Sequence, residues 1–180
     1  GTFLLLLTPA LDAGTEAMPK DMTFVFDTSG SMQGEKMTQA KAALRFCVGA
    51  LAPEDRFRIV RFSDTVELFR PEPLAATAEN REAANRWIER LEAVGSTDID
   101  AALQLALAHE SPRGRPHMIV FLTDGLPTAG VKDAREIVQR ALARNQAETR
   151  IFAFGVGNDV NRGLLEDLAE GTRAISCFVG

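Results

Sequence analysis

Three short segments of the sequence carry oxygen-bearing side chains at spacings that suit the binding of a small divalent cation. The first segment places Asp27, Ser29 and Ser31 at positions i, i+2 and i+4, so one carboxylate and two hydroxyls can converge within a turning loop. The second segment offers the hydroxyl of Thr97, and the third offers the carboxylate of Asp124. Hard oxygen donors with few carboxylates suit Mg²⁺, which keeps water ligands and tolerates neutral donors. The sequence therefore predicts a cation site for Mg²⁺, with Mn²⁺ and Ca²⁺ as alternatives.

Each of these residues also has an ordinary structural explanation. Serine and aspartate after a strand commonly form turns and helix N-caps, Thr97 could simply cap its helix, and Asp124 with Gly125 could form a plain turn. These explanations treat each loop separately. They do not explain why three loops at one edge of a sheet all offer oxygen donors without a surrounding basic cluster. One shared cation explains the three loops together.

The elements that must position these loops follow from the pattern of apolar residues. Short apolar runs predict strands, and apolar residues at helical spacing predict helices between them. The predicted strands are 3–7, 23–26, 57–62, 66–69, 118–122, 151–156 and 175–179. The predicted helices cover 37–51, 87–91, 99–107, 134–142 and 164–168.

This alternation predicts an α/β fold with a doubly wound, mostly parallel central sheet and helices on both faces. Runs 57–62 and 66–69, joined by a tight turn at Ser63 and Asp64, add one antiparallel edge strand. Ligands of such sheets bind at the carboxyl ends of the strands, where the strand order reverses. We therefore expect the chemistry in the loops after Phe26, Leu91 and Leu122.

Composition limits the domain organisation and the classes of partner. The chain has 180 residues, of which 46% are hydrophobic, so it can form one globular domain with a sizeable core. Residues 1–20 are predicted to be the end of a preceding module plus a linker, and residues 21–180 the domain itself. A net charge of −5 provides no basic field for nucleic acid. The longest apolar run, Phe3 to Leu7, is far too short to span a membrane, so this fragment is not expected to insert into one.

Several residues outside the three loops are assigned structural roles. The cysteines, Cys47 and Cys177, show no metal-ligand spacing and are predicted to be buried free thiols. Trp87 and the phenylalanines fall on apolar faces and are predicted to form the core. The histidines, His109 and His117, stand at a helix end and a strand start and are predicted to lie at the surface.

Three enzyme classes use residues related to these. A serine hydrolase needs a base beside its nucleophile, and neither histidine falls near the serines of the first loop. A phosphate-binding loop needs a different spacing, because only three residues separate Gly30 from Gly34 and Glu35 stands where lysine should follow. A phosphatase with Asp27 as nucleophile lacks a second carboxylate two residues later and any evident lysine for the phosphoryl group. None of the three enzyme classes fits well, so a non-enzymatic binding module is the preferred function. A metal-dependent phosphohydrolase is kept as the alternative.

The first loop resembles a known signature. The run from Asp27 to Ser31 resembles the D-x-S-x-S motif of von Willebrand factor type A domains, and Thr97 and Asp124 match the threonine and aspartate that complete the metal-ion-dependent adhesion site of that family. The resemblance implies a Rossmann-like fold and a cation with one open coordination position. A protein partner would fill that position with the carboxylate of an Asp or Glu. It also implies an extracellular, cell-surface or periplasmic location.

Other short segments of the sequence narrow the resemblance to one branch of the family. They look most like the heavy chains of inter-alpha-trypsin inhibitor and their bacterial relatives, and they include Gly34-Glu35-Lys36-Met37, Asp55-Arg56-Phe57 and Thr123-Asp124-Gly125-Leu126-Pro127-Thr128. Two departures stand out. Ser96 occupies a position where the relatives usually have glycine, which could alter the shape of the second loop. The chain also stops after the last predicted strand, so the final helix of such domains is expected to be missing.

Overall fold

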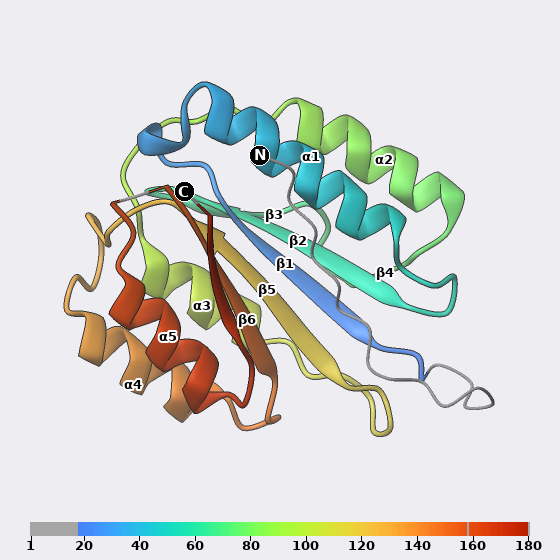
Figure 1. Ribbon diagram of the computed structural model, residues 1–180. Coiled ribbons are helices and arrows are strands. Elements are labelled where there is room, and N and C mark those ends of the chain that lie inside the picture. Colours follow the sequence, from blue (N-terminus) through green and yellow to red (C-terminus); the bar gives the residue numbers. More distant parts are fainter. Residues whose placement is uncertain (1–17, 158, 180) are drawn as a thin grey trace.

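The computed structural model describes residues 18–157 and 159–179 as three layers, with a central sheet between two layers of helices (Figure 1). The strands are β1 (Asp21–Asp27), β2 (Arg56–Phe62), β3 (Val66–Leu68), β4 (Leu74–Ala75), β5 (His117–Thr123), β6 (Arg150–Val156) and β7 (Ser176–Val179). The helices are α1 (Glu35–Gly49), α2 (Ala78–Glu89), α3 (Ile99–Leu107), α4 (Ala134–Arg144) and α5 (Arg162–Gly171), with the short 3₁₀ turn η1 (Gly30–Met32). The predicted strand 3–7 and most of the linker after it lie outside the described residues, and the domain boundary at residue 21 stays a prediction.

The sheet is mostly parallel. Its strand order is β3-β2-β1-β5-β6-β7, and β4 also pairs with β2. Strands β3 and β4 run antiparallel to β2, and the other pairs are parallel. The predicted α/β class, with its doubly wound sheet and an antiparallel edge strand, is therefore confirmed. Strand β4 has only two residues, and a segment this short carries no periodic pattern from which it could be predicted.

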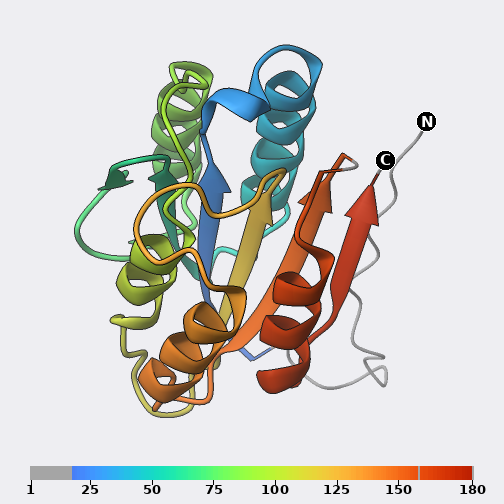
Figure 2. The ribbon, with the colours of Figure 1, turned by 90° about the vertical axis from the view of Figure 1, so that its left-hand side faces the viewer.

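The strand order reverses between β1 and β5. From β1 the chain moves outward through β2 to β3 on one side, and it then crosses over to build β5, β6 and β7 on the other. The arrowheads of β1, β5 and β6 all point to one edge of the sheet, which we call the carboxyl edge (Figure 2). Asp27 and Thr123 are the last residues of the neighbouring strands β1 and β5, so the first and third predicted loops leave the sheet side by side.

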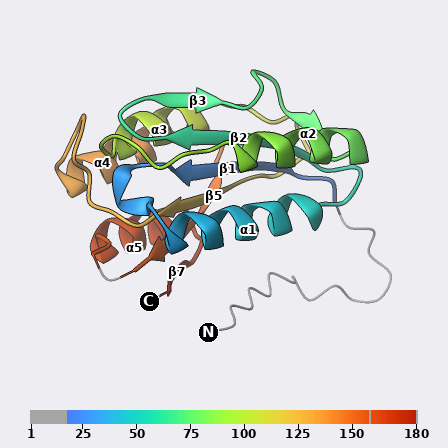
Figure 3. The same cartoon turned by 90° about the horizontal axis from the view of Figure 1, so that it is seen from above.

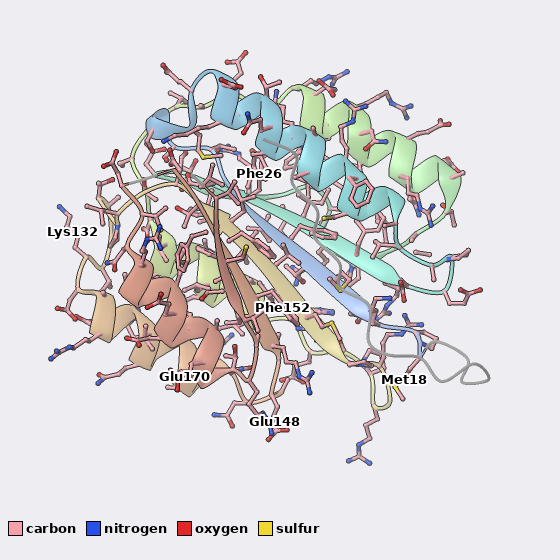
Figure 4. All side chains as sticks on the ribbon, viewed as in Figure 1. Met18, Phe26, Lys132, Glu148, Phe152 and Glu170 are labelled. Carbon is pink, nitrogen blue, oxygen red and sulfur yellow. The ribbon has the colours of Figure 1, made fainter. Side chains whose placement is uncertain are left out.

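Helices cover both faces of the sheet and bury its central strands. Helices α1 and α2 lie over one face, and α3, α4 and α5 lie over the other (Figure 1, Figure 3). Along β1 the side chains alternate, so Phe24 and Phe26 pack into the core under α1 and α2, and Val25 packs into the core on the α3 side. Phe26 is labelled on the α1 side of the sheet in Figure 4. All seven residues of β1 are buried, which holds Asp27 in a fixed position at the end of the strand.

The predicted core is wrong at a few positions. Phe46 is 71% exposed, because it follows the buried Leu44 by two residues and so projects from the opposite side of α1. Trp87 is only half-buried, although it packs against the core below α2. The two cysteines are free, as predicted, but both are half-buried rather than buried.

The histidines lie at the amino edge of the sheet, opposite the carboxyl edge. His117 is only 6% exposed, so its predicted surface position is wrong. Its Nε2 lies 2.8 Å from the Thr23 hydroxyl and its Nδ1 lies 3.0 Å from the Thr149 hydroxyl, so both ring nitrogens have partners. Burial lowers the pKa of His117 to about 4, so the ring is neutral at pH 7. His109 is half-buried beside it, with Nε2 3.3 Å from Asp21.

Candidate metal centre

Asp27 is buried at the end of β1 and is held through both of its carboxylate oxygens. The Ser29 backbone N–H donates to Oδ1 at 2.7 Å, and the Thr123 hydroxyl donates to Oδ2 at 2.5 Å. Burial raises the pKa of the Asp27 carboxyl above its ordinary value, the hydrogen bonds from Thr123 and Ser29 oppose this effect, and the nearby charge of Asp124 adds to it. A cation at this position would supply the positive charge that the ionised form of Asp27 needs.

The first loop turns immediately after Asp27 and brings its two serines together. Ser29 precedes the 3₁₀ turn η1, and its hydroxyl lies 3.1 Å from the hydroxyl of Ser31. Ser31 in turn donates to Asp124 Oδ1 at 2.7 Å. The first part of this loop is buried, since Asp27 and Ser29 are at most 1% exposed, whereas Ser31 is exposed.

The second loop is tied to the first by backbone hydrogen bonds. The Gly30 N–H donates to the Gly95 carbonyl at 2.9 Å, and the Val94 N–H donates to the Thr28 carbonyl at 2.8 Å. Gly95 has a φ of +87°, and a Cβ on it would come within 2.6 Å of Asp64 Oδ1, so the tight turn here requires glycine. Ser96 does not have a positive φ, so the serine that departs from the family pattern fits the loop without backbone strain.

Thr97 turns its hydroxyl toward the other loops. A Cβ on Gly125 would lie 3.7 Å from Thr97 Oγ1 and 3.6 Å from Ser31 Oγ, which places both hydroxyls around the same point of the third loop. Thr97 is only 3% exposed, yet its hydroxyl makes no hydrogen bond within the part of the chain that the structure describes. It does not cap the helix, because Asp98 accepts the capping bond of α3 from Ala101. Of the two explanations for Thr97, the helix cap is therefore excluded.

The third loop is hydrogen-bonded to the second and carries Asp124. The N–H groups of Thr128 and Ala129 donate to the Thr97 carbonyl at 3.0 and 3.1 Å, and the Thr97 N–H donates to the Thr128 hydroxyl at 2.8 Å. Asp124 is 1% exposed. It accepts from Ser31 on Oδ1 and from the ammonium of Lys36 on Oδ2, the latter at 2.6 Å.

The structure thus places all five predicted donors at the carboxyl edge, two of them carboxylates and three hydroxyls. They come from three loops, and the direct contacts among them link Ser29 to Ser31 and Ser31 to Asp124. Within residues 18–157 and 159–179, no group of three or more His, Cys, Asp or Glu side chains is close enough to hold a metal. A set rich in hydroxyls and poor in charge suits a hard cation such as Mg²⁺ better than a soft one. The residues present therefore fit the metal that was predicted from the sequence.

Sequence reasoning missed three residues of this centre. Thr123 binds Asp27, Thr128 positions the backbone of Thr97, and Lys36 pairs with Asp124. Lys36 corrects the expectation that no lysine is available near the first loop. Lys36 is the second residue of α1, near the positive end of the helix dipole, where cations are disfavoured. This unusual position is the sequence feature from which a role for Lys36 could have been predicted.

Comparisons with known proteins identify the family of the chain. Residues 20–178 match the family profile described as von Willebrand factor type A domain. The human inter-alpha-trypsin inhibitor heavy chain H4 is 34% identical over 164 residues, which cover 87% of this chain and 18% of that protein. The human heavy chain H6 is 34% identical over 174 residues, covering 91% of this chain and 13% of that one. The chain thus spans less than a fifth of the length of these relatives.

Solved structures share the fold at lower sequence identity. A von Willebrand factor type A protein from Catenulispora acidiphila superposes with a TM-score of 0.83 at 22% identity, covering 91% of this chain and 39% of that one. Proximal thread matrix protein 1 from the mussel byssus, solved with a zinc-occupied MIDAS motif, has a TM-score of 0.71 at 18% identity and covers 90% of this chain and 44% of its own. The profile match and the identity to the heavy chains show that the chain belongs to the von Willebrand factor type A domain family, close to the inter-alpha-trypsin inhibitor heavy chains.

Proposed function

We propose that this domain is a metal-dependent protein-binding module. Asp27, Ser29, Ser31, Thr97 and Asp124 would hold a divalent cation, with Mg²⁺ as the metal and Mn²⁺ or Ca²⁺ as alternatives. The observation that carries the proposal is the convergence of oxygen donors from three loops. The hydroxyls of Ser29 and Ser31 lie 3.1 Å apart, and Ser31 donates to Asp124 at 2.7 Å. Thr97 Oγ1 and Ser31 Oγ lie 3.7 and 3.6 Å from the position that a Cβ on Gly125 would take. One divalent cation bound among these oxygens would coordinate donors from all three loops.

The charges at the site support a carboxylate as the partner's contact. A divalent cation would balance Asp27 and Asp124, and Lys36 adds one positive charge through its contact with Asp124. The loaded site would then carry a net positive charge at the surface. A partner's Asp or Glu would neutralise this charge and complete the coordination of the cation, which is a charge-assisted contact with a defined geometry. The zinc-occupied site of the mussel protein is a precedent for a metal in this fold.

The described residues do not support an enzyme. The two histidines lie at the amino edge, where His117 is held by two threonines, so neither can serve as a base for Ser29 or Ser31. Asp27, the nucleophile of the alternative phosphohydrolase, is fully buried, so a phosphate ester cannot approach its carboxylate. We therefore propose a binding role without turnover, and a location outside the cytoplasm as the family resemblance implies. No helix in residues 18–157 and 159–179 is long and apolar enough to cross a membrane.

Metal binding is tested by calorimetric titration of Mg²⁺ and Mn²⁺ into the purified protein. Thr97→Val keeps the shape of the side chain but removes the hydroxyl, and it is expected to weaken binding by about 10-fold or more. Thr38→Val is the matched control, because Thr38 is exposed on α1 and donates only to the Gly34 carbonyl. Equal affinities for the two variants would remove Thr97 from the site.

Recognition of a carboxylate is tested by selecting peptides from a random library on the immobilised domain in Mg²⁺ and eluting them with EDTA. We expect the eluted peptides to share an Asp or Glu, and replacing it by Asn or Gln should weaken binding as much as EDTA does. Peptides that bind equally well in EDTA would exclude direct coordination. Peptides that need the metal but contain no acidic residue would show that the metal only stiffens the loops.

A further inference from the structure

Lys36 is placed so that its ammonium occupies the metal centre from inside the chain. Its Nζ lies 2.6 Å from Asp124 Oδ2, and the Asp124 side chain is fully buried. The lysine also runs beneath the loop after β6, where a Cβ on Gly157 would come within 3.2 Å of Lys36 Cε and 3.3 Å of Nζ. The ammonium thus lies between the third loop and the loop after β6, in a side chain that is 35% exposed, and it contacts one of the two carboxylates of the centre.

The position of Lys36 is unfavourable for the helix that carries it. Lys36 is the second residue of α1, where the unpaired N–H groups and the helix dipole repel a positive charge. Lys132, in the loop after Asp124, shows the ordinary arrangement for a lysine, since it is exposed and points away from the domain (Figure 4). A lysine held inward against the helix dipole must gain its stabilisation from another contact, and that contact is Asp124.

We propose that Lys36 is a resident counter-cation that competes with the divalent metal for Asp124. In the metal-free protein the ammonium neutralises a buried carboxylate that lies near the charge of Asp27, and so keeps the three loops together. When a divalent cation enters, it must share Asp124 with Lys36 and overcome the repulsion of that charge. Lys36 therefore lowers the affinity for the metal and makes its binding reversible. This inference rests on the proposed function and concerns the regulation of the same site.

The test compares Lys36→Met with the wild type in titrations with Mg²⁺. Lys36→Met is expected to bind Mg²⁺ at least about 10-fold more tightly, because a like charge beside the cation is removed. Lys41→Met and Lys132→Met are controls that remove the same charge elsewhere, since Lys41 donates to the Glu89 carbonyl and Lys132 is exposed. Both controls are expected to stay within about 2-fold of the wild type. An unchanged or weaker affinity in Lys36→Met would overturn the proposal.

A second measurement follows thermal unfolding in EDTA and in saturating Mg²⁺. Lys36→Met should melt below the wild type in EDTA, because Asp124 is left buried without a counter-charge, and the difference should disappear in Mg²⁺. In an Asp124→Asn background, Lys36→Met should change the melting temperature little, since the carboxylate that it neutralises is gone. A deficit that is equal in EDTA and Mg²⁺ would assign Lys36 a purely structural role.

The outcomes separate this inference from the proposed function. If neither the wild type nor Lys36→Met binds Mg²⁺ or Mn²⁺, both proposals fail. If the wild type binds metal and Lys36→Met binds it no better, only the competition fails. If the wild type binds too weakly to measure and Lys36→Met binds well, both are supported.

Discussion

Strand β1 carries a buried aspartate at each of its ends, and the two are surrounded in opposite ways. Asp21, at the amino edge, is 2% exposed and receives two hydrogen bonds from Arg56, at 2.9 and 2.5 Å, and one from the Ser111 hydroxyl at 2.7 Å. Asp27, at the carboxyl edge, is fully buried and receives bonds only from a backbone N–H and a neutral hydroxyl among the described residues.

The pKa values of the two carboxyls move in opposite directions. Burial alone would raise the pKa of Asp21, but the hydrogen bonds from Arg56, Ser111 and His109 outweigh it and lower the pKa to about 2. Burial raises the pKa of Asp27, and its hydrogen bonds do not reverse the shift. Arg56 compensates the buried charge of Asp21 from within the protein, whereas Asp27 has only neutral donors, and under the proposed function a metal would compensate its charge. Four predictions test this contrast.

The largest expected effect is the loss of metal binding in Asp27→Asn. The substitution keeps an oxygen acceptor but removes the charge that a divalent cation needs, so the affinity for Mg²⁺ should fall by more than about 100-fold. Asp21→Asn, at the other end of the strand, should leave the affinity within about 3-fold of the wild type. Calorimetric titration of both variants decides the matter, and unchanged binding by Asp27→Asn would remove this residue from the site.

The order of the two variants should reverse for stability. Asp21→Asn leaves Arg56 without its charged partner at the amino edge and should lower the free energy of unfolding by about 3 kcal/mol. Asp27→Asn in EDTA should cost less than about 1 kcal/mol, because it also removes a buried negative charge near Asp124. Urea unfolding followed by circular dichroism measures both values. A larger loss in Asp27→Asn than in Asp21→Asn would contradict the contrast.

The amino edge should also respond to mild acid through His117. Its pKa of about 4 in the folded protein lies below the ordinary value of 6.5, so between these two pH values the unfolded chain binds a proton that the folded one does not. Stability should therefore fall as the pH drops from 6.5 to 4, by up to about 3 kcal/mol from this group. His117→Asn should show a flatter pH dependence in urea unfolding over this range. Parallel curves for the wild type and the variant would show that the buried ring does not cause the loss.

The smallest expected effect is an absence of turnover at the carboxyl edge. Because Asp27 is fully buried and a phosphate ester cannot approach its carboxylate, the domain should not hydrolyse a generic phosphate monoester in Mg²⁺ or Mn²⁺. The measurement is release of the phenol from a chromogenic phosphate ester, with Asp27→Asn as the control for contaminating enzymes. Turnover that disappears in Asp27→Asn would favour the phosphohydrolase over the binding module.

Much of the fold and of the site could be predicted from local patterns. The apolar runs in β1 and β5 predict buried strands, and the sequence places Asp27 at the carboxyl end of the first run and Asp124 just after the second. The Asp27, Ser29 and Ser31 spacing predicts a loop with converging oxygens, and the structure brings Ser29 and Ser31 to 3.1 Å. These features depend on residues close together in the chain. The metal-binding role of the five donors remains a prediction.

Local patterns failed where a residue's environment comes from distant segments. Phe46 is apolar but lies on the outer side of α1, and His117 is polar but is enclosed by Thr23 and Thr149, which come from two other parts of the chain. Hydrophobicity predicts burial only on average, and the packing of neighbouring elements decides the individual case.

The sequence by itself determined the order of strands and helices, the edge at which the donors gather, and the types of donor, because these follow from periodicity and spacing. Only the tertiary structure decided how each buried charge is compensated. Asp21 meets Arg56 across 35 residues of chain, Asp124 meets Lys36 across 88, and Asp27 meets Thr123 across 96. The pKa of a buried carboxyl depends on charges and donors within a few ångströms in space, so the pKa values of two aspartates six residues apart on one strand shift in opposite directions.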